Sequence, residues 1–64
     1  MEKEEILRYI KGFSKISVRN VCLDLKIHYP NVMTGEASKK NMLKVKKEIE
    51  RRIKVLEGKY ENNN

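Results

Sequence analysis

The chain has 64 residues, 39% of them hydrophobic and 6% aromatic, which limits it to one small domain with an aliphatic core. Its single cysteine excludes an intrachain disulfide, and Cys22 and His28 are too few soft ligands for structural zinc, which needs about four. No run approaches a signal-peptide core or the roughly 20 apolar residues of a membrane span, so we expect a cytoplasmic protein, and the net charge of +6 favours an anionic partner.

The first predicted helix covers residues 2–11. Acidic residues open it, which suits the positive end of a helix dipole, and apolar residues follow at helical spacing. Those apolar residues are Ile6, Leu7 and Ile10. Gly12 is a natural stop, and we expect Phe13 to pack beneath the end of the helix.

A second, shorter helix is predicted to start at Ser17 and to run to about residue 25. Ser17 is a favourable N-cap, and Ile16 before it is spaced to pack on Val21 as a hydrophobic staple. The apolar face of this helix consists of Val18, Val21, Cys22 and Leu25. The residues expected to point to water are Arg19, Asn20 and Asp24.

A short third helix is predicted over residues 30–34. Pro30 disfavours a helical Tyr29 but suits the first position of a new helix, and Gly35 closes it.

The last predicted helix is long and covers residues 39–58. Ser38 is placed to cap it, and its apolar residues recur at intervals of three and four. These residues are Met42, Val45, Ile49, Ile53, Leu56 and Tyr60. The ion pairs expected along it are Glu48 with Arg52 and Glu50 with Lys54. The whole pattern predicts a small all-α domain of three to four helices over residues 1–60, followed by a disordered tail of residues 61–64.

The basic charge is concentrated in the middle of the chain. Residues 1–25 carry a net charge of +1, residues 26–47 carry +5 and residues 48–64 carry 0. Such a concentration is typical of a site for a polyanion, whereas a uniformly solubilised surface would spread its charge. The alternative is that the charge run is only a solvated face.

Residues 17–34 place two short helices around a tight turn. Two helices that cross steeply need a small residue at the crossing and three further apolar anchors. These four places are filled by Cys22, Leu25, Ile27 and Val32. The segment resembles the helix-turn-helix of phage-repressor-like prokaryotic regulators, with Cys22 where that family usually carries alanine. It departs from the family pattern at Lys26, where the turn usually has glycine, and at Gly35, where an apolar residue is expected, so the third helix should be short.

The resemblance implies that the start of the third helix faces the major groove of DNA. The residues that it assigns to base contacts are His28, Tyr29, Asn31, Met33 and Thr34. Asn31 is the leading candidate because a carboxamide can pair bidentately with adenine, while Thr34 suits a thymine methyl or a phosphate and Tyr29 a backbone oxygen. Contacts to the phosphate backbone are expected from Arg19, Lys26, Ser38, Lys39, Lys40 and Lys44.

Several of these residues also have a purely structural interpretation. His28 can be an exposed turn residue, and Asn31 can be a polar residue of the first helical turn. Cys22 suits a small core position, and Met33 and Met42 suit core positions as fillers.

The sequence carries no glycine-rich phosphate loop, no cysteine paired with a base and no acid in an apolar setting, so we expect no enzymatic activity, cofactor, metal or small-molecule substrate. It predicts a small sequence-specific protein for double-stranded DNA, a regulator or accessory factor of a phage, plasmid or other mobile element. The alternative is a helical module that binds a larger host or phage protein, and RNA is disfavoured because no aromatic stacking platform is evident. The long helix has more apolar positions than the first two helices can cover, which predicts homodimer contacts at Ile53, Leu56 and Tyr60.

Overall fold

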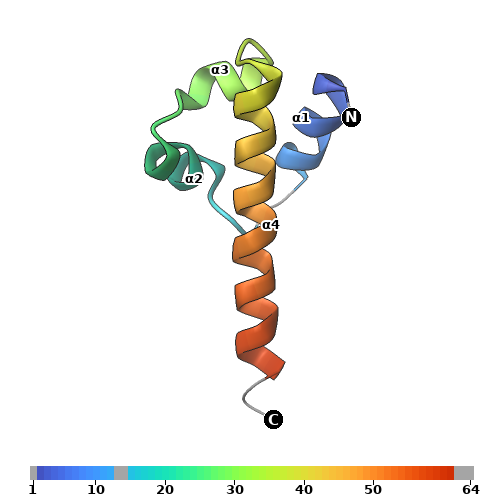
Figure 1. Cartoon of the computed structure of the whole chain (residues 1–64), viewed down its shortest axis with the longest axis vertical. Helices are drawn as coiled ribbons and strands as arrows, with labels where there is room; N and C mark the ends of the chain where they lie inside the picture. The colour runs from blue at the N-terminus through green and yellow to red at the C-terminus, as the bar shows by residue number, and fades with distance from the viewer. Residues whose placement is uncertain (1, 13–14, 62–64) are drawn as a thin grey trace.

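Helix α4 is the central rod of the molecule, and the other three helices surround its N-terminal half (Figure 1). The computed structural model describes residues 2–12 and 15–61, with side chains as far as residue 58. Within these residues the elements are α1 (Lys3–Lys11), α2 (Val18–Leu25), α3 (Tyr29–Thr34) and α4 (Lys39–Glu61), and none is a strand. The predicted all-α class with a long C-terminal helix is therefore confirmed. None of these described helices has both the length and the apolar character that crossing a membrane requires.

The helix boundaries differ from the predicted ones at three ends. Helix α1 begins at Lys3, one residue later than predicted, and α3 begins at Tyr29, one residue earlier. Pro30 is tolerated there as the second helical residue because the first-turn amides have no intrahelical partner. Helix α4 continues past Gly58 to Glu61, whereas Phe13 and residues 62–64 of the predicted tail lie outside the described residues.

Side chains from all four helices form one core. Those that are fully buried are Ile6, Ile10, Val21, Cys22, Val32, Met42, Val45 and Ile49. The core interpretation of Cys22 and Met42 is confirmed, and burial raises the pKa of the Cys22 thiol because the charged form loses hydration. Two short helices, α2 and α3, are thus held against the rod by a core that is almost entirely aliphatic.

Serine caps start the second and fourth helices as predicted. The Asn20 amide donates to Oγ of Ser17 at 3.2 Å, and the Asn41 amide donates to Oγ of Ser38 at 3.1 Å. Each cap satisfies one of the amides that a helix N-terminus leaves without an intrahelical acceptor.

One of the two predicted ion pairs of α4 is present and the other is replaced. Nε of Arg52 lies 2.7 Å from Oε2 of Glu48, as predicted. Glu50 instead pairs with Lys46, whose Nζ lies 2.9 Å from Oε1, so the predicted partner Lys54 was wrong. Lys46 is better placed because its Nζ also lies 4.7 Å from the centroid of an aromatic ring on α1, which holds it beside Glu50.

Candidate functional site

The turn between α2 and α3 is a compact cap in which Lys26 adopts a left-handed conformation, with φ 60° and ψ 40°. The Ile27 amide donates to the Cys22 carbonyl at 2.8 Å, and the Lys26 amide donates to the Leu23 carbonyl at 3.1 Å, which is the Schellman pattern. Glycine is the residue that usually adopts this conformation, since it has no Cβ. A lysine here costs about 1–2 kcal/mol, so the turn keeps a glycine-like shape at the expense of stability.

Helix α3 is short and its six residues carry no charge. Val32 is buried in the core, while Pro30, Asn31 and Thr34 are exposed. The Asn31 carbonyl accepts from Oγ1 of Thr34 at 3.3 Å and from the Ala37 amide at 2.9 Å, which fixes the backbone at the end of the helix. The Asn31 carboxamide makes no hydrogen bond with another described residue, so its donors and acceptor face solvent.

The side chains of the other predicted base contacts differ in how exposed they are. His28 is exposed at the start of α3, whereas Tyr29 and Met33 are half-buried and pack against the core. The guanidinium of Arg19 lies 5.4 Å from the centroid of the Tyr29 ring, which places this predicted phosphate contact beside the start of α3. Of the five predicted base contacts, those with exposed side chains are therefore His28, Asn31 and Thr34, and we call these three the reading surface.

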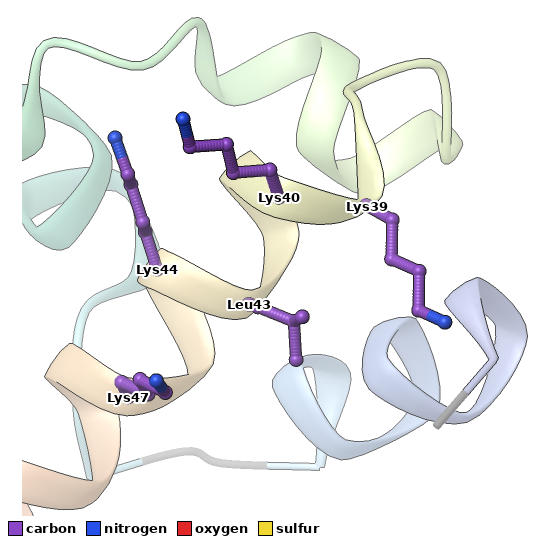
Figure 2. Close-up of a pocket in the computed structure, with 5 residues that line it drawn as sticks. All are labelled: Lys39, Lys40, Leu43, Lys44 and Lys47. Carbon is purple, nitrogen blue, oxygen red and sulfur yellow. The ribbon is translucent and has the colours of Figure 1, made fainter.

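Four lysines gather on one side of α4. Lys39, Lys40, Lys44 and Lys47, which we call the lysine face, line an open hollow together with Leu43. Figure 2 shows Lys39 and Leu43 extending toward α1, whereas Lys40 and Lys44 extend away from it. The structure thus brings together three predicted phosphate contacts and adds Lys47, which the prediction missed. Its spacing from Lys40 and Lys44, at i+7 and i+3, is the signal that identifies it as part of the same helix face.

The lysine face is not neutralised by the protein. No described carboxylate forms an ion pair with any of its four ammonium groups, and the first turn of α4 contains no acidic residue. Lys39 and Lys40 lie at the N-terminus of α4, where the helix dipole is positive and a cation is unfavourable. Lys40 and Lys44 are also a like-charged i, i+4 pair. These charges oppose the stability of the helix.

The lysine face projects from the side of α4 that is opposite the core, whereas α3 packs on the core. Met42, Val45 and Ile49 point from α4 into the core, and helical spacing puts the lysines on the opposite side of α4. Val32 of α3 enters the same core, so α3 lies on the core side of α4. Lys26 is exposed in the turn next to α3.

The C-terminal half of α4 is the other exposed feature. Leu56 is 39% exposed and Val55 is 57% exposed, whereas Ile53 is half-buried against the core. Val55 and Leu56 line a second hollow with Ile16, Arg51 and Arg52. Two of the three predicted dimer contacts are thus accessible or partly so, and the side chain of Tyr60 lies outside the described part of the chain.

Comparisons of the chain with protein-family models, with curated proteins and with solved structures found no match.

Proposed function

We propose that this protein binds double-stranded DNA, with the lysine face holding phosphates and α2, the turn and α3 acting as a helix-turn-helix that reads bases. The observation that carries the proposal is the lysine face, four ammonium groups without a described carboxylate partner on one side of one helix. A cluster of lysines that opposes the fold is most simply explained by an external polyanion, and the phosphate backbone of DNA is the polyanion that such stripes neutralise.

The reading surface supports sequence recognition. Helix α3 is uncharged, so attraction to phosphates does not determine what it contacts, and its exposed polar side chains, Asn31 and Thr34, carry hydrogen-bonding groups. Asn31 presents a free carboxamide, the group that pairs bidentately with N6 and N7 of adenine. Lys26 is exposed in the turn before α3 and Arg19 lies beside Tyr29, so both suit phosphate contacts next to this surface. A role as regulator or accessory factor of a mobile element rests on the resemblance of residues 17–34 alone.

A second candidate function is a helical module that binds a larger protein. The exposure of Val55 and Leu56 favours it, because apolar side chains in water are typical of interaction surfaces. This surface is distinct from the lysine face, so DNA binding and protein binding are separable by mutation.

The proposal is tested by measuring affinity for a random-sequence duplex at increasing salt concentration. Replacing Lys40 and Lys44 by Gln should lower the slope of log affinity against log salt by up to about 1.8, at about 0.9 for each lost phosphate contact. The matched control replaces Lys11 and Lys54, two exposed lysines outside the lysine face, and should leave the slope nearly unchanged. Equal effects of the two double variants would mean that net charge alone drives the binding and would contradict the proposal.

A further inference from the structure

Helix α3 exposes one narrow face, and three side chains make up that face. At about 100° per residue, Pro30, Thr34 and Asn31 lie within an arc of about 100°, and the buried Val32 lies on the opposite side of the helix. The other residues of α3 are half-buried. From Pro30 to Thr34 the face spans about 6 Å of helix axis, close to the rise of two base pairs at about 3.4 Å each. The chemistry of these three side chains therefore determines which bases the helix can recognise.

The hydroxyl group of Thr34 is already engaged within the helix. Its Oγ1 donates to the Asn31 carbonyl at 3.3 Å, and a hydroxyl has one hydrogen to donate. Phosphate oxygens accept hydrogen bonds, so this hydroxyl does not bond a phosphate while it donates to the backbone. The methyl group of Thr34 stays available for an apolar contact. Of the two contacts expected from the sequence, this arrangement favours the thymine methyl over the phosphate.

The side chain of Pro30 can contact only an apolar group. Its ring carries no polar atom, and proline has no backbone N–H to offer. Pro30 is exposed and lies one helical turn before Thr34, at i and i+4, so their apolar groups are neighbours on the face. The apolar group that base pairs present in the major groove is the C5-methyl of thymine. Pro30 and Thr34 therefore suit the same kind of contact.

Helix α3 has no side chain that suits guanine or cytosine. Guanine is most often read by arginine or lysine, and cytosine by aspartate or glutamate. The six residues of α3, with the sequence YPNVMT, include none of these four types. The carboxamide of Asn31 instead matches N6 and N7 of adenine. Each of the three exposed side chains thus matches a group that an A·T pair presents.

We propose that the exposed face of α3 selects two neighbouring A·T pairs, with Asn31 on an adenine and with Pro30 and Thr34 on thymine methyl groups. This inference rests on the proposed function, because it assumes that α3 enters the major groove. It adds Pro30, which the sequence-based expectation left out, as a specificity-determining residue.

The inference is tested with the full chain on duplexes that differ by single methyl groups. A preferred duplex is selected from a random pool, each of its thymines is replaced in turn by deoxyuridine, which lacks only the C5-methyl, and Kd is measured by fluorescence anisotropy. The wild-type chain should select neighbouring A·T pairs. At one or two thymines the replacement should weaken binding about fourfold, which corresponds to one buried methyl group at about 0.8 kcal/mol.

Two variants of one residue provide the matched comparison. Thr34→Ser removes the methyl group and keeps the hydroxyl that donates to Asn31, so the loss of affinity at a responsive thymine should shrink. Thr34→Val keeps a methyl group and removes the hydroxyl, so the fourfold loss should remain. Pro30→Ser, which replaces the ring by a polar side chain, should shrink the loss as Thr34→Ser does. The salt slope should be that of the wild type in all three variants, because no phosphate contact is lost.

The possible failures of the inference and of the proposed function are distinguishable. A pool without an enriched sequence, a selected site that lacks neighbouring A·T pairs, or a site whose thymines can all be replaced without loss of affinity would overturn the inference and leave DNA binding standing. Equal loss of the response in Thr34→Ser and Thr34→Val would also overturn it, because the methyl group would not be the group in contact. Binding to no duplex at low salt would remove both the inference and the proposed function.

Discussion

Arg52 of α4 donates from Nη2 to Oδ2 of Asp24 of α2 at 2.5 Å, and this pair ties the helix that precedes the turn to the central rod. The same guanidinium donates from Nε to Oε2 of Glu48 at 2.7 Å, so one arginine donates hydrogen bonds to two carboxylates. Glu48 also accepts from Nη2 of Arg51 at 2.6 Å. The ion pair that links α2 to α4 therefore uses an arginine that is itself held by Glu48.

We expect stability to depend on pH through Glu48. Hydrogen bonds from Arg51 and then from Arg52 lower the pKa of Glu48 from 4.5 to about 2. Because the folded-state pKa lies below the ordinary value, the stabilisation is fully present above about pH 4.5 and is lost as the pH falls toward 2. The melting temperature of the wild type, followed by circular dichroism, should exceed that of Glu48→Gln at pH 7 and approach it near pH 2.

The control for this prediction is Glu57→Gln, which changes an exposed acid of the same helix for which no described ion pair exists. Its melting curve should follow the wild type at every pH. A constant difference between wild type and Glu48→Gln from pH 7 to pH 2 would refute the assignment.

Replacing Lys26 by glycine should stabilise the protein. The left-handed conformation at φ 60° costs a lysine about 1–2 kcal/mol, whereas glycine adopts it freely and loses about 0.5–1 kcal/mol of that gain to its more flexible unfolded state. The free energy of unfolding in urea should rise by about 0.5–1 kcal/mol in Lys26→Gly. Lys26→Ala keeps the strain and removes the same charge, so a matching gain in that variant would show that charge, not backbone conformation, is responsible.

Local sequence patterns predicted the helices well but not every boundary. Periodicity and serine caps placed three of the helices, and Pro30 and Gly35 placed the third one along the chain, because those signals act within a few residues. The last helix was predicted to end at Gly58, yet this residue lies within α4, where an added Cβ would meet nothing within 4 Å. Glycine permits a helix to end but does not force it to, and Lys26 shows the converse, a left-handed cap without glycine.

Contacts between distant segments could not be predicted from the sequence. The Asp24–Arg52 pair joins residues 28 positions apart, and no local pattern indicates which arginine Asp24 meets. The predicted partner of Glu50 was wrong because the lysine that pairs with Glu50 is determined by how Lys46 packs on α1. The lysine face was largely predictable, since charge and helical spacing are both local, but its position opposite the core-facing side of α4 required the fold.

Placing an acid at the start of α4 should raise stability and weaken DNA binding together. In Lys40→Glu the new carboxylate meets the positive end of the helix dipole and pairs with Lys44 at i, i+4, which together stabilise by about 0.5–1 kcal/mol. The same change removes one phosphate contact and adds a repulsive charge, so duplex affinity should fall steeply at low salt. The two effects are measured by urea unfolding and by fluorescence anisotropy. If Lys40→Glu lowered both the free energy of unfolding and the duplex affinity, Lys40 would contribute to the stability of the fold and not to DNA binding.

The exposed end of α4 should mediate self-association at high concentration. Leu56 continues the apolar stripe of Ile49 and Ile53 past the other helices, whereas Val55, which lines the same hollow, is not part of that stripe. Sedimentation at high micromolar concentration should show dimer in the wild type and in Val55→Asp, and monomer in Leu56→Asp. A strictly monomeric wild type would exclude the dimer, and an equal loss in both variants would point to nonspecific association.

Asn31→Ala should separate base reading from phosphate binding. The carboxamide of Asn31 is exposed and makes no hydrogen bond with another described residue, so its removal should leave the fold intact. On a preferred site, obtained by selecting bound duplexes from a random pool, the variant should lose about 1–3 kcal/mol of binding free energy and relax discrimination at one base pair. Its salt slope should stay that of the wild type, because no phosphate contact is lost, whereas Lys39→Ala/Lys40→Ala should flatten the slope and lower the affinity for all duplexes alike.

Two outcomes would contradict this prediction. If Asn31→Ala also acts only through the salt slope, α3 does not read bases. If neither variant alters DNA binding while a protein partner is lost, the interaction-module function replaces the one proposed.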